Sequence, residues 1–444
     1  MKTYLRELSH YPSAVVSLVL ILLLVGISIY AVTSIPYAEA TRLWRGGEEI
    51  WYANPRQAAP EWLNWFTKKK QPVSFALKTD DPAVTKEVTT DERGNSEIIL
   101  TYTFDFAYDY FPQDVIIYFT SVYATKQPYA DVIWITPDGR EIRVNNFALP
   151  DRQTYRISQD ERLKRLLRNE PPLEALFRDP KIETPTPLKG TYQLVISAYT
   201  FEKDSSVDAE LILHGTLAGW AGTDHLRRDL GIALLWGTPI ALAFGLLAAL
   251  GATITTMIIA AIGAWYRGWV DELIQRITEI NLVLPFLPLL LMIGTFYSRS
   301  IWIILGAAIL LSIFSGSIKT NRAIFLQIKE APFIEAARAY NASDWRIILR
   351  YLTPRLIPTL VPQLVTLVPT YVFIEASLAV LGLGDPILPT WGKVINDAFV
   401  NSAPYLGLYY WMLEPAVMLV ITGMAFSMLG FSLDRIFNPR LRQI

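Results

Sequence analysis

Long uncharged apolar segments constrain the fold of this 444-residue chain more than any other feature. A helix that crosses about 30 Å of hydrocarbon needs roughly 20 apolar residues, and six segments reach or approach that length. We therefore expect an α-helical membrane protein with six transmembrane helices. Leu230–Tyr266 is long for one span and short for two, so part of it should lie along the interface or extend beyond the bilayer. The segments are Ser13–Ile35, Leu230–Tyr266, Ile280–Ser298, Ser300–Ile318, Leu356–Ile374 and Pro415–Leu433.

The positions of Lys and Arg predict the orientation of these spans, because short cytoplasmic loops of membrane proteins are enriched in basic residues. Lys2 and Arg6 precede the first span, and the loop at 319–355 is also basic. With six spans, these regions and the arginines of the tail fall on one side. We expect both termini in the cytoplasm and residues 36–229 outside. A retained first span is favoured over a cleaved signal peptide, whose apolar core usually has about 7–15 residues. The tail arginines are Arg435, Arg440 and Arg442.

The polar block at 36–221 has the pattern of a separate β-rich domain. Apolar and polar residues alternate in short segments, and Pro137–Arg140 is a strong turn signal between two of them. We expect an inserted, mainly-β extracytoplasmic domain resembling an antiparallel sandwich, with one helix at Arg162–Arg168 that Ser158–Glu161 would cap. The Trp-rich stretch Arg42–Lys70 is expected to form an amphipathic helix near the membrane surface. The expected strands are Glu97–Asp105, Asp114–Thr120, Ala130–Thr136, Glu141–Asn145, Thr191–Tyr199 and Asp208–His214.

The composition argues against several classes of function. A formal net charge of −1 gives no electrostatic reason to expect a nucleic acid partner. The chain has no Cys, which excludes disulfides and thiolate metal sites, and its three His residues are scattered. It has neither a Gly-x-x-x-x-Gly-Lys-Ser/Thr phosphate loop nor a convincing catalytic constellation. We therefore expect a membrane protein in contact with lipid that is not an enzyme and that binds no metal or cofactor itself.

The loop at 319–355 is the most distinctive polar stretch of the chain. Glu335–Ala339 consists of strong helix formers, and Asn341 stands where this helix would end in a left-handed residue. Ser343 can cap a second helix, which is expected to stop before Pro354. Two short helices that meet at an angle would form a compact knob for a partner to hold. An ordinary helical hairpin is the alternative.

This loop resembles the EAA loop of ABC importer permeases. The pattern of that loop is Glu-Ala-Ala, three residues, Gly, nine residues and then Ile-x-Leu-Pro. The small alanines would let the groove of a partner approach the helix closely. Glu335, Ala336, Ala337 and Pro354 match the pattern at the expected spacing, whereas Asn341 replaces the Gly, and Tyr351 and Thr353 replace the Ile and the Leu.

Further segments resemble the dipeptide, oligopeptide and nickel type of these permeases, in particular the second permease subunit. Gly222–Asp229 looks like the entry to the second span of that type, with Arg227 in place of a Gly. Gly263–Arg276, together with Leu284–Phe286, is similar to the loop that leads into the third span of these permeases. Asn438–Arg442 is similar to the end of their sequence. The resemblance covers 222–444 well and 1–35 weakly, and it leaves 36–221 as an insertion. The motif positions outside the loop are Gly222, Thr223, Asp224, Asp229, Glu375, Gly382, Gly384, Trp391 and Gly392.

The resemblance implies the type I ABC importer permease fold in a prokaryotic cytoplasmic membrane. It implies a translocation pathway shared with a second permease subunit, two cytoplasmic ATPase subunits that bind ATP and Mg, and an extracytoplasmic solute-binding protein. Peptides would be the substrate by family frequency. The loop would sit in a groove of one ATPase, with Glu335 as a polar contact and Ala336 and Ala337 as close-packing surface. The implied coupling residues are Glu335, Ala336, Ala337, Arg338, Asn341, Asp344 and Pro354. Arg338, Arg346 and Arg350 are candidates for contacts to acidic groups, and a solvated helix face is the alternative for each of them.

Several points stay open at the level of sequence. Proline-interrupted helices can open backbone groups to a cavity, although simple kinking is the alternative. Glu375 and Glu414, near the outer ends of the last two spans, are interpreted as interfacial residues, with a role as substrate ligands as the alternative. A membrane-anchored receptor or sensor is the alternative function, in which 36–221 would bind a ligand; otherwise this insertion would be a structural cap or a docking platform. The interrupting prolines are Pro285, Pro288, Pro358, Pro362 and Pro369.

Overall fold

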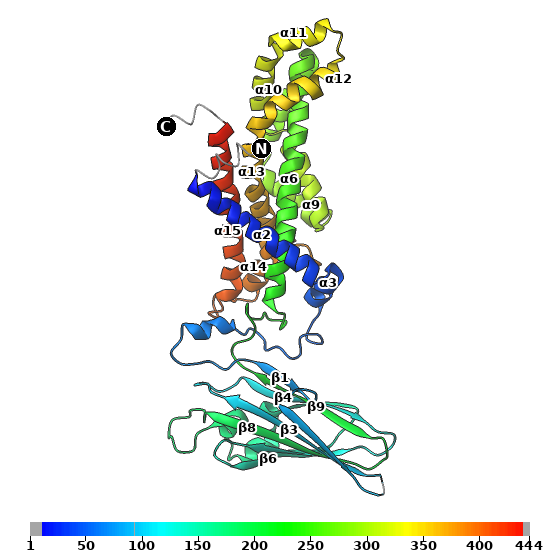
Figure 1. Ribbon diagram of the computed structural model, residues 1–444, viewed down its shortest axis with the longest axis vertical. Coiled ribbons are helices and arrows are strands. Elements are labelled where there is room, and N and C mark those ends of the chain that lie inside the picture. Colours follow the sequence, from blue (N-terminus) through cyan, green and yellow to red (C-terminus); the bar gives the residue numbers. More distant parts are fainter. Residues whose placement is uncertain (1–10, 93, 438–444) are drawn as a thin grey trace. The chain divides into compact units, whose positions relative to one another are not determined.

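The computed structural model describes residues 11–92 and 94–437, and it divides into two compact units (Figure 1). One unit is Gly46–Gly231, and the described residues on either side of it form the other. The insertion expected at 36–221 overlaps the first unit, which begins and ends about ten residues later. Some residues of the orientation and family arguments lie outside the described part of the chain, namely Lys2, Arg6, Arg440, Arg442 and the end motif Asn438–Arg442.

The second unit is helical and apolar. In the described residues, four helices are long and apolar enough to cross a membrane, and two bent helix pairs bring the possible number of spans to six. Within the unit, α15 packs against α2 and α13. The helices are α2 (Pro12–Ser34), α3 (Tyr37–Arg45), α6 (Leu230–Tyr266), α7 (Gly268–Val283), α8 (Phe286–Phe296), α9 (Ile301–Ile313), α10 (Gly316–Lys329), α11 (Pro332–Ala339), α12 (Asp344–Ile347), α13 (Thr353–Leu378), α14 (Trp391–Val400) and α15 (Tyr410–Phe437).

Two of the expected spans are broken. The segment Ile280–Ser298 is divided between α7 and α8, which are bent by 81°. Leu284 there has extended backbone, as a residue before Pro285 prefers. The segment Ser300–Ile318 is divided between α9 and α10, which are bent by 48°. In contrast, Leu230–Tyr266 is one continuous helix of 37 residues.

The chain stays helical through Pro354, so the expected stop before this proline is wrong. A wide π-helical turn, Ile348–Leu352, follows α12, and Pro354 lies in the first turn of α13. Proline is tolerated there because the N–H groups of a first turn have no partner within the helix. The π-helical turn changes the hydrogen-bond register just before the proline and lets the two helices join.

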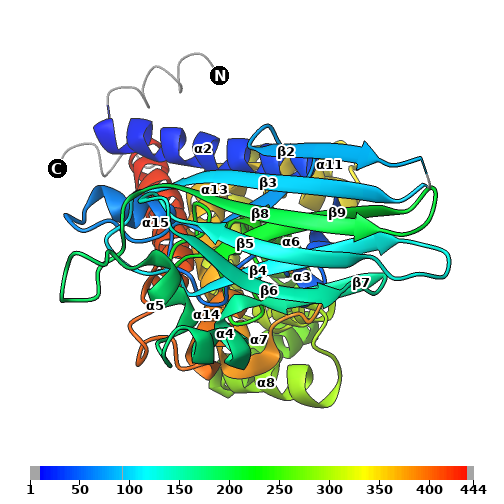
Figure 2. The same cartoon turned by 90° about the horizontal axis from the view of Figure 1, so that it is seen from below.

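The Gly46–Gly231 unit contains two antiparallel sheets, as the alternating pattern predicts. Their strand orders are β1-β9-β4-β7 and β2-β3-β8-β5-β6, and Figure 2 shows the five-stranded sheet. Both sheets contribute to one core, in which Trp134, Tyr102 and Phe106 are fully buried. The strands are β1 (Phe75–Lys78), β2 (Val84–Thr90), β3 (Ser96–Phe106), β4 (Asp114–Val122), β5 (Tyr129–Ile135), β6 (Glu141–Ala148), β7 (Arg152–Arg156), β8 (Gly190–Thr200) and β9 (Ser206–His214).

Two local predictions for this region are wrong. Arg42–Lys70 does not form one amphipathic helix: α3 ends at Arg45, and a short 3-10 helix, η1 (Glu61–Trp65), follows much later. Glycines and prolines between them, which interrupt helices, account for the break. The predicted cap at Ser158 is also displaced, because α4 (Glu161–Leu166) is capped by Asp160, whose side chain accepts hydrogen bonds from two backbone N–H groups.

Candidate functional site

The loop at 319–355 folds into a small helical knob. α10, α11 and α12 follow one another at one end of the helical unit (Figure 1). Apolar side chains of these helices are buried in one cluster with side chains of α6, α7 and α13. Ile334 of α11 and Ile347 of α12 are fully buried in this cluster, together with Phe325 of α10. The knob is therefore a packed element that a partner can grip without unfolding it. Its core comprises Ile318, Phe325, Ile334, Ala337, Ile347, Ile348 and Leu352.

The turn between α11 and α12 is formed by Asn341. Its φ of 56° is left-handed, which confirms the predicted cap geometry. The backbone N–H of Asn341 donates to the Arg338 carbonyl at 2.8 Å, and that of Ala342 donates to the Ala337 carbonyl at 3.1 Å. These bonds satisfy carbonyl groups at the end of α11. Ser343 does occupy the N-cap position of α12, but in the described structure its side chain makes no capping hydrogen bond.

The expected contact surface needs one correction. Glu335 and Ala336 are exposed, as a partner contact requires, but Ala337 is only 8% exposed and belongs to the core of the knob. The helical period places Ala336 and Ala337 about 100° apart, so they cannot both face a partner squarely. Asp344 and Pro354 are exposed.

Large apolar side chains on the knob were missed by the sequence analysis. Tyr340 is 89% exposed, and Trp345 and Leu349 are also exposed. Large apolar residues within a charged loop are the sequence signal that could have identified this surface. Exposed aromatic residues on a packed scaffold are typical anchors of protein interfaces. We call the following set the knob surface: Glu335, Ala336, Tyr340, Asn341, Asp344, Trp345 and Leu349, all exposed.

Basic residues attach the knob to the end of α6. The Lys329 ammonium donates to the Trp265 carbonyl at 2.6 Å and to the Ala264 carbonyl at 3.1 Å. The guanidinium of Arg338 lies over the Trp265 ring, 4.5 Å from its centroid. Arg322 of α10 forms an ion pair with Asp271 of α7. Arg338, which was expected to contact acidic groups of a partner, thus has an aromatic partner within its own chain. Arg338, Arg346 and Arg350 are all exposed.

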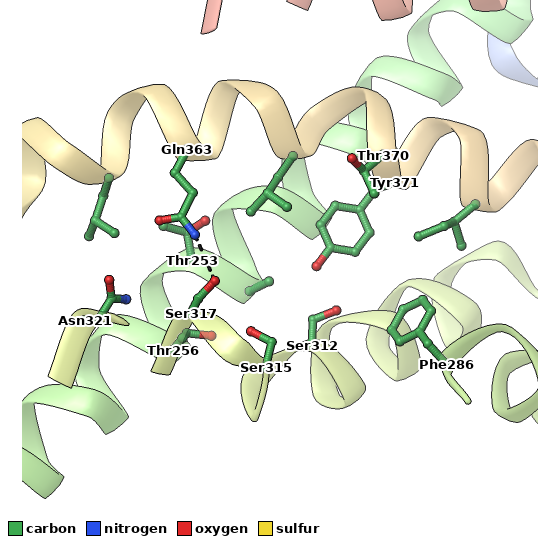
Figure 3. Close-up of a pocket in the computed structure, with 14 residues that line it drawn as sticks. Thr253, Thr256, Phe286, Ser312, Ser315, Ser317, Asn321, Gln363, Thr370 and Tyr371 are labelled. Carbon is green, nitrogen blue, oxygen red and sulfur yellow. Dashed lines mark hydrogen bonds between the residues drawn. The ribbon is translucent and has the colours of Figure 1, made fainter. Parts of the chain in front are cut away.

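A cavity of about 280 Å3, lined by both polar and apolar residues, lies among α6, α8, α9, α10 and α13 (Figure 3). Hydroxyl and amide groups point into it, and the Gln363 amide donates to the Ser317 hydroxyl at 2.8 Å. None of the described residues that line it is charged. Hydroxyl and amide residues within apolar segments were the signal that sequence reasoning missed. The polar lining residues are Thr253, Thr256, Ser312, Ser315, Ser317, Asn321, Gln363, Thr370 and Tyr371.

The proline-interrupted helices do border this cavity. Pro285 precedes α8, whose first residue, Phe286, lines it. On α13, the lining residues Gln363 and Thr370 directly follow Pro362 and Pro369. These two prolines are themselves buried. The groups of α13 that face the cavity are therefore the side chains next to the prolines.

The motif at Gly222–Asp229 forms a tight hydrogen-bonded turn just before α6. The Asp224 carboxylate accepts bonds from the Arg228 backbone N–H at 2.9 Å and from its guanidinium at 2.5 Å. The Thr223 hydroxyl donates to the Pro55 carbonyl at 2.8 Å. Gly222 has a φ of 75°, and the Asp229 carboxylate accepts the Gly231 N–H at 2.8 Å. These four motif residues therefore shape the backbone.

Arg227, which stands where the motif has Gly, adopts the left-handed φ of 65° that glycine would favour. Its guanidinium is buried and donates to the Asn54 carbonyl at 2.7 Å. The side chain thus ties the turn to a segment of the insertion. This contact explains how a non-glycine residue is held in a conformation that is otherwise unfavourable.

The motif residues after α13 form a second tight turn. Gly382 has a φ of 90°, and the chain then folds back so that the Trp391 indole N–H donates to the Leu234 carbonyl at 3.1 Å. A Cβ on Gly392 would lie 2.6 Å from the Ala376 Cα, so only glycine fits there. Gly384 likewise lies close to Ala379 and Lys393. Glu375, which was interpreted as an interfacial residue, is only 7% exposed.

Metal binding has no evident site in the described ranges. No group of three or more His, Asp or Glu residues there could hold a metal ion.

Comparison with known proteins identifies the helical unit. Residues 252–443 match the family model described as "Binding-protein-dependent transport system inner membrane component". The chain is 30% identical over 249 residues to the glutathione transport system permease protein GsiD of Escherichia coli O6:K15:H31, which covers 54% of this chain and 79% of the relative. It is 29% identical over 230 residues to the protein of the same name from Pectobacterium atrosepticum, which covers 51% of this chain and 74% of the relative.

Proposed function

Because this chain belongs to the family of binding-protein-dependent transport system inner membrane components, as an importer permease of the dipeptide and oligopeptide type, we propose that it forms one half of the pathway through which a peptide enters the cell. The permease subunits of this family are not themselves enzymes. ATP and Mg would therefore be bound by two ATPase subunits. A second permease subunit would supply the other half of the pathway, and a solute-binding protein would deliver the peptide.

The knob surface is the observation that carries this proposal. It presents the carboxylate of Glu335 and the exposed rings of Tyr340 and Trp345 on a packed scaffold. An ATPase groove that closes on this surface would displace the knob. The attachment of Lys329 and Arg338 to Trp265 would pass that displacement to α6. A rigid element that moves as one body is the usual structural basis of such switching.

The cavity in Figure 3 supports a peptide as the transported solute. Uncharged hydroxyl and amide groups can donate and accept hydrogen bonds to a peptide backbone without binding it as tightly as a charged group would. A transport pathway has to release its solute, so weak and replaceable contacts suit it. The relatives are named for glutathione, which is itself a small peptide.

We further propose six spans in a prokaryotic cytoplasmic membrane, with the α7–α8 and α9–α10 pairs each counted as one broken span. Both termini and the knob would then face the cytoplasm, and the β unit would lie outside. The basic residues of the loop and tail support this orientation. The receptor alternative has no support in the comparisons, which match the chain to transport permeases.

Charge reversal on the knob tests the coupling role. We expect Glu335→Lys to abolish uptake of a peptide in vesicles reconstituted with the whole complex, and to reduce co-purification of the ATPase subunits. Glu272→Lys is the matched control, because Glu272 is an exposed glutamate on α7 outside the knob surface. Uptake by the Glu335→Lys complex at the level of the control would refute the coupling assignment.

A further inference from the structure

Two adjacent aromatic side chains protrude from the β unit at the end of η1. Trp65 is 82% exposed and Phe66 is 78% exposed. The rings of Trp62 and Phe66 stand edge to face with their centroids 6.2 Å apart. Large apolar groups that are this exposed and this close together are typical of a surface that binds a membrane or another protein. We call Trp62, Trp65 and Phe66 the aromatic tip.

The loop behind the aromatic tip is closed by side-chain hydrogen bonds, so the exposure is built into the fold. The Asn64 amide donates to the Gln71 carbonyl, and the Gln71 N–H donates back to the Asn64 amide oxygen, both at 2.9 Å. The Lys70 N–H donates to the Asp109 carboxylate at 2.7 Å. These contacts hold both ends of residues 64–71 and present the tip on a fixed loop.

The same loop is tied to the chain that leads into α6. The Glu61 N–H donates to the Gly219 carbonyl, and the Gly219 N–H donates to the Glu61 carboxylate, both at 2.9 Å. Next to Gly219, the partly exposed Trp220 packs so closely on Gly231 that a Cβ there would lie 2.5 Å from the indole nitrogen. Gly231 is the second residue of α6. The loop is therefore anchored to a segment that enters a candidate membrane span within about a dozen residues.

Three consecutive lysines follow the tip. Lys68, Lys69 and Lys70 are exposed. The Lys70 ammonium donates to the Asn64 carbonyl at 2.5 Å, which directs it toward the loop. Asp109, the nearby carboxylate, forms an ion pair with Lys189 at 2.6 Å, and the ammonium of Lys189 together with the Lys70 N–H lowers the pKa of Asp109. Lys68 and Lys69 therefore place two exposed positive charges beside the tip.

We propose that the aromatic tip, Lys68 and Lys69 dock the β unit on the membrane surface, with the rings among the lipid headgroups and the two ammonium groups near anionic phosphates. Trp and Phe beside basic residues match the interfacial region of a bilayer, where indole rings concentrate and each basic residue is attracted to acidic lipid. The link from Glu61 to Gly219 favours lipid over a protein partner, because it fixes the tip on the segment that leads into α6, a candidate membrane span.

Site-specific labelling tests this proposal in the full chain. Because the native chain has no Cys, a single Cys can carry a polarity-sensitive fluorophore without background labelling. Thr67→Cys places the label next to the tip and leaves Trp65 and Phe66 in place. Val88→Cys is the control, because Val88 is an exposed apolar residue on β2. Both proteins would be studied in nanodiscs of phosphatidylcholine, with and without phosphatidylglycerol.

We expect the label at position 67 to emit at shorter wavelength than the label at position 88, and to be quenched severalfold more strongly by headgroup spin-labelled lipid. Adding Trp65→Ser and Phe66→Ser should abolish both effects, and Lys68→Gln with Lys69→Gln should weaken quenching only when phosphatidylglycerol is present. Equal quenching at positions 67 and 88 would overturn the proposal. A shift at position 67 that appears only after a solute-binding protein is added would assign the tip to that protein and overturn it equally.

Discussion

The guanidinium carbon of Arg338 lies 4.5 Å from the centroid of the Trp265 ring. Arg338 belongs to α11 of the knob, and Trp265 is the second-last residue of α6. A cation over an indole face contributes about 0.5–2 kcal/mol, depending on its exposure to solvent. The Lys329 ammonium reinforces the same junction through its hydrogen bond to the Trp265 carbonyl. Trp265 is thus one of the α6 residues that join the knob to this helix.

Replacing this residue should weaken coupling without removing the partner contact. In Trp265→Leu the knob surface is unchanged, but the Arg338 guanidinium loses its aromatic partner. We expect the complex to assemble and hydrolyse ATP while it transports severalfold less peptide per ATP. Paired uptake and hydrolysis assays in vesicles measure this ratio. Trp269→Leu, at an exposed Trp of α7, is the control; an unchanged ratio in Trp265→Leu would argue against this junction as the transmitting contact.

The two alanines of the loop should respond differently to the same change. Ala337 is buried in the core of the knob, so Ala337→Leu overpacks it and should cost about 1–3 kcal/mol of stability. Ala336 is exposed, so Ala336→Leu should leave the unfolding temperature of the purified chain unchanged and instead reduce co-purification of the ATPase subunits. Thermal unfolding and pull-down assays separate the effects. Equal unfolding temperatures for the two variants would contradict the buried position of Ala337.

Gly392 should tolerate no larger residue. A Cβ there would lie 2.6 Å from the Ala376 Cα and 2.7 Å from its carbonyl oxygen, and backbone atoms cannot move aside as a flexible side chain can. We expect Gly392→Ala to destabilise the helical unit by about 1–3 kcal/mol, seen as a lower unfolding temperature in detergent. Gly306→Ala is the matched control in α9, where a Cβ would have open space. The prediction fails if both variants unfold at the temperature of the parent chain.

The β unit should lose stability in mild acid through His214. Burial, with the positive charges of Arg227 and Arg156, lowers the pKa of His214 to about 4, below the value of about 6.5 for an unfolded chain. Between these values the unfolded chain binds a proton and the folded chain does not. Stability is therefore complete above about pH 6.5 and falls as the pH is lowered toward 4, by at most about 3 kcal/mol.

Denaturant unfolding followed by the circular dichroism of the strands measures this effect in the full chain. The His214→Gln variant cannot take up the proton, so its stability should vary less between about pH 7 and pH 4 than that of the parent. A parallel pH dependence in the two proteins would show that other groups cause the acid sensitivity.

Sequence alone predicts the elements whose pattern is local. Strands with alternating burial, such as β3 and β8, follow directly from their residues, and so does the left-handed turn at Asn341. In β2, by contrast, only Val84 is buried. That strand has little internal pattern and depends on pairing with β3. The polar strand β7 pairs only with β4 within the described sheets, and it was missed for the same reason.

Properties that depend on packing were beyond sequence reasoning. The motif identifies Ala336 and Ala337 together, but only the arrangement of α10 to α12 shows that Ala337 faces inward. The cavity brings Ser317 and Gln363 together from helices that are 46 residues apart in sequence. Burial of Glu375 likewise depends on the turn at Gly382 and on the return of the chain through Trp391.

The uninterrupted course of α6 has a mechanical consequence. At 1.5 Å per residue, 37 residues form a rod about 55 Å long, well beyond the roughly 30 Å of a hydrocarbon layer. Pro239 is the only proline inside α6, and no proline interrupts the helix between Pro239 and its C-terminal end. A force applied at Trp265 is therefore expected to tilt α6 as a whole. In contrast to α6, its neighbouring helix pairs are bent, at the breaks before Phe286 and Gly316.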